Sequence, residues 1–284
     1  PSSGSMMASE ESPYSIGVPP WASTRLEQLL PEFIELYENR PILDNTGGMR
    51  APHMFATFAI LRCLQPEVVI ESGVWKGAGT WLIENAAPGA QIIALDPDLS
   101  RLEYRSPSAS YSTQDFNHHD WSGLPGNTLA FFDDHQNALE RIQQCNWHGI
   151  SDIIFEDNYP PGRGDCYSLK KMFAGAGFEP ARPTGLKGLL RRLIRATGSG
   201  RSVPAGIDNL LAARRNIEVY AEFPPVVKPQ ATRWGDAWTG PQYATPPSIF
   251  SPDDESIPPV FRAESEWYTW LAFVRLTCSG ATEL

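Results

Sequence analysis

The sequence lacks the features that mark several common classes of protein. No apolar run approaches the ~18 residues that a membrane-spanning helix needs. The four cysteines form no Cys-x-x-Cys pair, which predicts reduced thiols and a cytoplasmic protein. Basic residues number 23 against 33 acidic ones, giving a net charge of −10. We therefore expect no transmembrane segment, no disulfide framework and no nucleic-acid partner.

Length and patterning predict one large α/β domain with additions. The start, Pro-Ser-Ser-Gly-Ser-Met, resembles a cloning scar, so we interpret residues 1–20 as a tag and flexible arm. Helical spacing of apolar residues over 22–38 and 51–64 predicts an N-terminal helical region at 21–64. The main domain covers 65–284, with inserts near 179–202 and 224–265. Long irregular inserts of this kind are usually lids, binding loops or disorder.

From residue 68 onward, short apolar runs alternate with helical patterns. This alternation predicts a mostly parallel sheet with right-handed crossovers. We expect strands at 68–71, 91–96, 111–116, 128–133, 152–156, 217–223 and 267–276, and helices starting near 77, 136 and 167. Binding sites in such sheets lie at the carboxyl ends of the strands. Acids occupy these ends in the first five strands: Glu71, Asp96, Asp115, Asp133 with Asp134, and Glu156 with Asp157.

The segment 66–77 carries the strongest motif, Pro-Glu-Val-Val-Ile-Glu-Ser-Gly-Val-Trp-Lys-Gly. It predicts a strand, a tight turn and a helix, with Gly73 and Gly77 letting a ligand approach the backbone. The spacing differs from the Gly-x-Gly-x-x-Gly of nicotinamide-binding proteins, which argues against an NAD-dependent oxidoreductase. Asp96 ends the next strand about 20 residues later, where an acid binds ribose hydroxyls in nucleotide folds.

This segment resembles the first motif of class I S-adenosylmethionine (SAM) methyltransferases. Gly73-Val74-Trp75-Lys76-Gly77 is most similar to the macrocin-type enzymes, which methylate sugars and macrolides. The resemblance implies a Rossmann-like fold with seven strands, the last antiparallel. It implies SAM as cofactor, bound by Glu71, Gly73, Trp75, Gly77 and Asp96. We also expect Asp115 and Phe116 at the adenine, and Arg50 at the methionine carboxylate or the acceptor.

A second motif combines Phe131-Phe132-Asp133-Asp134-His135 with Phe155-Glu156-Asp157-Asn158. It resembles the metal site of catechol-type, cation-dependent O-methyltransferases. The resemblance implies Asp133, Asp157 and Asn158 as ligands of Mg²⁺, or of Mn²⁺ or Ca²⁺; Asp134 is an alternative to Asp133. Oxygen ligands suit these hard cations, and a bound cation lowers the pKa of a coordinated hydroxyl.

The chain departs from the catechol-type pattern at the general base. The lysine that stands there three residues after the metal-binding Asp is Gln136 in this sequence. Histidine is a residue type that suits a general base, so we expect His135 and Asp133 to carry catalysis; the alternative is a surface position for His135. His118 and Asp120 have the spacing of part of a non-haem iron site, which an α/β chain disfavours.

These patterns together predict a SAM- and cation-dependent O-methyltransferase that acts on a hydroxyl of a sugar, polyketide or phenol. The alternatives are a non-catalytic SAM- or metal-binding module that recruits an acidic partner, and a cephalosporin-hydroxylase-like protein. The basic amphipathic segment 186–195 is expected to capture an anionic acceptor or to pack as a lid. A homo-oligomer is compatible with the sequence.

Overall fold

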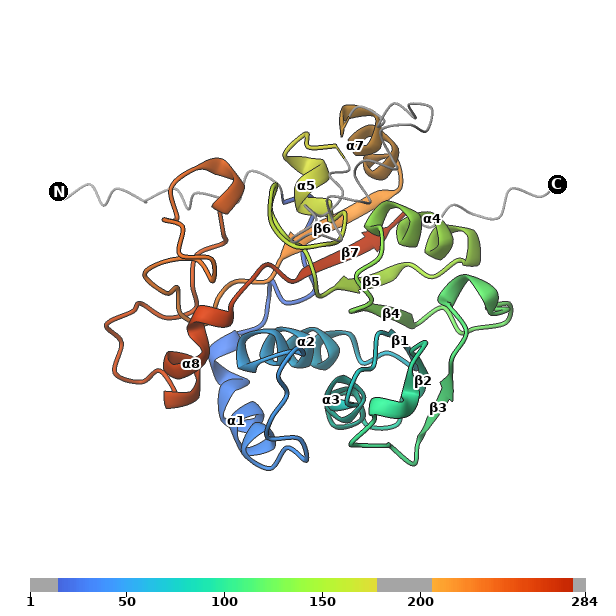
Figure 1. Cartoon of the computed structure of the whole chain (residues 1–284), viewed down its shortest axis with the longest axis horizontal. Coiled ribbons are helices and arrows are strands. Elements are labelled where there is room, and N and C mark those ends of the chain that lie inside the picture. Colours follow the sequence, from blue (N-terminus) through green and yellow to red (C-terminus); the bar gives the residue numbers. More distant parts are fainter. Residues whose placement is uncertain (1–14, 178–205, 278–284) are drawn as a thin grey trace, which may run out of the picture.

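Residues 15–177 and 206–277 are described by a computed structural model and form a seven-stranded sheet (Figure 1). The strand order is β3-β2-β1-β4-β5-β7-β6. The strands are β1 Val68–Ser72, β2 Gln91–Leu95, β3 Ala109–Ser112, β4 Thr128–Phe132, β5 Asp152–Phe155, β6 Ile217–Glu222 and β7 Ala272–Leu276. The strands β1 to β5 pair in parallel, whereas β7 is antiparallel to both β5 and β6. The predicted Rossmann-like fold with an antiparallel last strand is confirmed.

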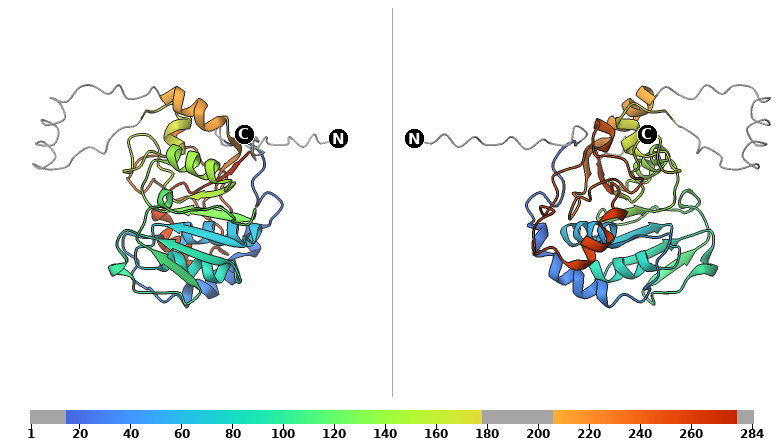
Figure 2. Two further views of the ribbon diagram at one scale, coloured as in Figure 1. Left: turned by 90° about the vertical axis from the view of Figure 1, so that its right-hand side faces the viewer. Right: turned by 60° about the vertical axis from the view of Figure 1, so that its left-hand side comes forward.

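Helices cover both faces of the sheet, because successive side chains of each strand point to opposite sides. Leu129 and Phe131 of β4 join the core under α1 Leu30–Glu38, α2 Ala51–Leu64, α3 Ala78–Ala86 and α8 Pro259–Glu264. Ala130 and Phe132 join the core under α4 Ala138–His148, α5 Leu169–Phe173 and α7 Gly206–Arg214. Figure 2 shows these two helical layers on either side of the sheet.

Two expected strands differ from those found. The strand expected at 111–116 ends at Ser112, because Asp115 caps a short 3₁₀ helix, η3 Phe116–His118, by accepting a hydrogen bond from the Asn117 N–H. The strand expected from residue 267 begins at Ala272, because Ser265–Trp267 forms another 3₁₀ turn, η5. The remaining 3₁₀ helices are η1 Leu26–Gln28, η2 Leu99–Arg101 and η4 Pro241–Tyr243.

The expected insert at 224–265 is irregular but packed. Val226, Ile257 and Phe261 are buried in the same core as α1 and α2. The insert at 179–202, with its basic segment 186–195, lies outside the described residues, as does most of the expected arm. Ile16, near the end of that arm, pairs with Tyr220 of β6. Among the described helices, none is both long enough and apolar enough to span a membrane.

Candidate active site

The turn after β1 is shaped by contacts with the protein's own chain. Gly73 has a φ of +96°, and a Cβ there would lie 2.1 Å from the carbonyl oxygen of Asp133. A Cβ on Gly77 would lie 2.2 Å from the carbonyl oxygen of Tyr104. Both glycines are therefore required by close backbone packing, where the sequence suggested the approach of a ligand. Asp96 closes the turn, since its Oδ2 accepts hydrogen bonds from the N–H groups of Val74 and Trp75 at 2.9 Å.

A cavity of about 500 Å³ opens beside this turn, at the carboxyl ends of β1, β2 and β4. This volume lies within the roughly 300–1,000 Å³ typical of small-molecule sites. Its walls include Gly73, Trp75, Leu95, Gln114, His118 and His135, with four acids, Asp96, Asp115, Asp133 and Asp134. Arg141 is the one arginine or lysine on these walls, and its guanidinium is bound by Asp115 and Asp134 at 2.7 Å each. Acidic charge is therefore in excess, which favours a cationic ligand.

Several residues expected at the cofactor lie elsewhere. Glu71 is fully buried behind the turn, where the Thr80 hydroxyl donates to it and burial raises its pKa to about 8. Phe116 is buried against Trp121 and Phe132, so it does not face the cavity. Gly77 and Arg50 are also absent from the cavity walls that the structure describes.

Three carboxylates lie close together beside the cavity. They belong to Asp133, Glu156 and Asp157, and we call them the carboxylate cluster. Burial raises the pKa of Asp133 and of Asp157, and the charge of Glu156 adds to both shifts. One oxygen each of Asp133 and Asp157 and one ring nitrogen of His135 all lie within 4.8 Å of one another. Asp157 Oδ2 is buried and accepts no hydrogen bond from the described residues, although His135 Nδ1 lies within ion-pair distance of it. The cluster therefore has the oxygen donors and the uncompensated charge of a cation site.

The buried contact between His53 and Glu156 does not neutralise the negative charge of the carboxylate cluster. His53 Nδ1 contacts the Glu156 carboxylate, while His53 Nε2 accepts the backbone N–H of Thr269 at 3.0 Å. A backbone N–H can only donate, so Nε2 must carry a lone pair and Nδ1 the proton. In this arrangement the imidazole is neutral and donates to Glu156, which keeps its negative charge.

The residues expected as metal ligands differ in the partners that hold them. Asp134 is engaged by Arg141 and by the Ser72 hydroxyl at 2.7 Å, which leaves Asp133 as the acid facing the cluster. The Asn158 Oδ1 accepts the Lys170 N–H at 2.8 Å, and its amide donates to the Tyr220 hydroxyl at 2.9 Å. These bonds engage both ends of the Asn158 amide. Glu156 is the further acid whose charge acts on Asp133 and Asp157; its place at a strand end is visible in the sequence, but the sequence indicates no role for it.

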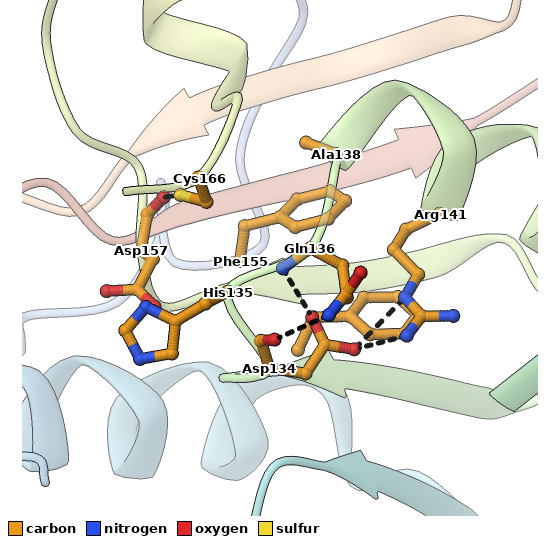
Figure 3. Close-up of a pocket in the computed structure, with 9 residues that line it drawn as sticks. Asp134, His135, Gln136, Ala138, Arg141, Phe155, Asp157 and Cys166 are labelled. Carbon is orange, nitrogen blue, oxygen red and sulfur yellow. Dashed lines mark hydrogen bonds and ion pairs between the residues drawn. The ribbon is translucent and has the colours of Figure 1, made fainter. Parts of the chain in front are cut away.

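His135 lies at the edge of the cluster, in a strained backbone conformation with a φ of +54°. Its Nδ1 is 2.9 Å from Asp165 Oδ1 and 3.1 Å from Asp157 Oδ2. Figure 3 shows the imidazole beside the Asp157 carboxylate, with Arg141 turned to Asp134. Gln136, at the position of the catechol-type lysine, donates to the Asp134 carbonyl oxygen.

His118 and Asp120, which have the spacing of part of an iron site, have different surroundings. His118 lines the cavity, whereas Asp120 accepts the Ser122 N–H and His119 stacks on Trp121. Among the described residues, the one group able to hold a metal is Asp133, His135 and Asp157.

Comparisons with known proteins give the following results. No family model matches the sequence, and no curated protein matches it. Among solved structures, CmcI with SAH is 18% identical over 38% of this chain and 61% of its own, with a TM-score of 0.34. The plantazolicin methyltransferase BpumL with SAH is 12% identical over 88% of this chain and 94% of its own, with a TM-score of 0.34. The chain thus spans less than two thirds of the CmcI structure, and overlaps of this size establish neither its family nor its activity.

Proposed function

We propose that this protein is a SAM-dependent, divalent-cation-dependent O-methyltransferase. The observation that carries the proposal is the place of Asp133. This one residue lines the acid-walled cavity and also belongs to the carboxylate cluster. A cofactor in the cavity and an acceptor at the cluster would therefore meet at Asp133, within reach of the in-line attack at ~3 Å that methyl transfer needs.

The cavity fits SAM by charge and by donors. SAM carries a sulfonium and an ammonium group against one carboxylate, so an acid-rich wall favours it, and the phosphates of NAD(H) would be repelled. Asp96 Oδ1 accepts one hydrogen bond, from the Asp98 N–H, and has capacity for a ribose hydroxyl. Trp75 Nε1 is buried without a partner in the described chain, which leaves it free to donate to a ligand. Glu71 and Gly77 support the turn from behind.

We expect Asp133 and Asp157 to supply the oxygens for a hard cation, with His135 beside them, while the charge of Glu156 adds to the attraction of the site. Mg²⁺ is the expected ion, with Mn²⁺ or Ca²⁺ as substitutes. When bound, such an ion lowers the pKa of an acceptor hydroxyl and holds it in place. Asp157 Oδ2 is buried and accepts no hydrogen bond from the described residues, and its ion-pair contact there is His135 Nδ1 at 3.1 Å; a bound cation would add the compensation that a buried carboxylate oxygen needs.

His135 is placed to take the proton of the acceptor hydroxyl. If its Nδ1–H donates to Asp165, its Nε2 carries the free lone pair of a general base. Asp165 then fixes the tautomer and orientation of the imidazole. The acceptor is a hydroxyl of a sugar, polyketide or phenol, and we expect the reaction to take place in the cytoplasm.

The test is methyl transfer from SAM to a panel of diols and phenols, assayed with the protein stripped in EDTA and after Mg²⁺ is restored. We expect turnover of at least one acceptor, lost on chelation and recovered with Mg²⁺. Undiminished turnover in stripped protein would remove the cation from the proposal. SAM binding without turnover of any acceptor would instead favour a binding module.

A further inference from the structure

Two arginines share one exposed tryptophan ring near the carboxylate cluster. The guanidinium carbons of Arg50 and Arg233 lie 5.4 and 5.5 Å from the ring centre of Trp267. Neither arginine is within ion-pair distance of a carboxylate in the described chain, in contrast to Arg141 and Arg163. Trp267 is 41% exposed and Arg233 is exposed, while Arg50 is half-buried, so solvent reaches this pair.

Two acids close to Arg50, Glu264 and Asp44, already accept hydrogen bonds from other groups. Glu264 accepts hydrogen bonds from the Tyr37 hydroxyl at 3.0 Å and from the Ala51 N–H at 2.8 Å. Asp44 accepts from the Thr46 hydroxyl and N–H. Stacking on an indole uses the face of a guanidinium and leaves its N–H donors at the edge, which match an oxyanion.

The arginine pair is tied to the cluster from two directions. Thr269, two residues after Trp267, bonds His53, which in turn holds Glu156. On the other side, Trp234 beside Arg233 packs edge-on against Tyr159, with ring centres 6.0 Å apart. Tyr159 follows Asp157 by two residues.

From this arrangement we infer that the acceptor carries an oxyanion, a carboxylate or a phosphate, which Arg50 and Arg233 bind while its hydroxyl lies at the carboxylate cluster. The inference rests on the proposed function and names the substrate class. Of the two roles expected for Arg50, at the methionine carboxylate or at the acceptor, it selects the acceptor. It also places anion capture within the described chain, independently of the basic segment 186–195.

The experiment compares matched acceptors by calorimetric binding and by methyl transfer. Catechol is paired with 3,4-dihydroxybenzoate, and glucose with glucose 6-phosphate, so the two pairs separate a carboxylate from a phosphate. We expect one anionic probe to bind at least about tenfold more tightly than its neutral partner, since a hydrogen bond to a charged group typically changes affinity by that much. This advantage should shrink as salt is raised.

Arg50→Gln and Arg233→Gln should each abolish the anionic advantage. Arg215→Gln, at an exposed position just after α7, is the matched control and should keep it. SAM titrations of the same variants should be unchanged. Equal binding of neutral and anionic probes by the wild type, or equal loss in the Arg215 variant, would overturn the inference.

Failure of this inference is distinguishable from failure of the proposed function. If the wild type binds SAM but shows no anionic preference, only the acceptor class is wrong. If it shows the preference but does not bind SAM, the methyltransferase proposal is wrong. Arg233 is exposed in a loop, so its variant remains informative even if the Arg50 variant, at the start of α2, does not fold.

Discussion

The cavity beside β1 and the surface around Trp267 differ in the charge that they leave unpaired. In the cavity, the single arginine is bound by Asp115 and Asp134, so acids remain in excess. Around Trp267, two guanidiniums lie against the ring without a carboxylate within ion-pair distance in the described chain. A net charge of −10 therefore describes neither site, because local pairing decides which ligand each one favours.

The largest effect that we expect is at Asp157, in the carboxylate cluster. Asp157→Asn keeps the shape of the side chain but removes a proposed ligand charge, so turnover should fall by more than the ~10–100-fold typical of outer-shell changes. SAM affinity should stay close to that of the wild type. Turnover with saturating Mg²⁺ and calorimetry with SAM are the measurements.

Asp208→Asn, on the exposed side of α7, is the control for the loss of one carboxylate. Wild-type turnover in the Asp157 variant, or a matching loss in the Asp208 variant, would contradict the assigned role. A loss of SAM binding in the Asp157 variant would show that cavity and cluster are not separable.

A second prediction concerns the buried ion pair of Lys170 and Glu222. The Lys170 ammonium donates to both Glu222 oxygens at 2.8 and 2.9 Å and to the Ala244 carbonyl oxygen at 3.1 Å. Lys170→Met leaves Glu222 buried without its cation, so the free energy of unfolding should fall by ~3–5 kcal/mol. Urea denaturation measures this change.

The control for this pair is the double variant Lys170→Met with Glu222→Gln. It removes both charges and should recover part of the lost stability. If the double variant is as unstable as the sum of the two single ones, the pair is not coupled in the folded protein.

A third prediction concerns the pH dependence of stability that Glu71 causes, behind the turn beside the cavity. Burial raises the pKa of Glu71 to about 8, above its value of about 4.3 in an unfolded chain. The folded state thus binds this proton more tightly, so the contribution to stability is complete below about pH 4 and is lost as pH rises to about 8. The loss is about 1.4 kcal/mol per pH unit at most.

Glu71→Gln removes this titration and keeps an acceptor oxygen for Thr80. Between pH 5 and pH 8, the wild type should lose stability relative to the variant in parallel chemical denaturation series. A constant difference between the two proteins across that range would show that Glu71 is ionised in the folded state throughout.

The smallest effect is expected at Asp96. Asp96→Ala removes the proposed ribose acceptor and two hydrogen bonds within the turn, so SAM affinity should weaken by about tenfold or more. Calorimetric titration measures it, with Asp98→Ala as a neighbouring control that leaves the Asp96 carboxylate in place. Equal affinities in all three proteins would remove Asp96 from the site.

Local sequence was enough to predict the fold and the position of the turn. The apolar run of β1, with Gly73 and Gly77 behind it, specifies a strand–turn–helix unit by itself. The strand ends also placed Asp133 and Asp157 correctly at one edge of the sheet, because parallel strands end together.

The parts of the site that could not be predicted depend on contacts between residues that are far apart in the sequence. Asn158 is hydrogen-bonded by the Lys170 N–H and by residues of β6 more than 60 positions away. Glu156 and its partner His53 are 103 residues apart. Phe116 turns into the core because Asp115 begins a 3₁₀ helix there, a choice that the strand-like pattern at 111–116 did not reveal.

The central claim is that the acid-walled cavity binds a cationic cofactor of the SAM type. The most direct measurement is calorimetric titration of the wild-type protein with SAM and, in parallel, with NADH at the same concentration. We predict saturable binding of SAM and none of NADH. Binding of NADH, or the absence of SAM binding with and without Mg²⁺, would contradict the claim.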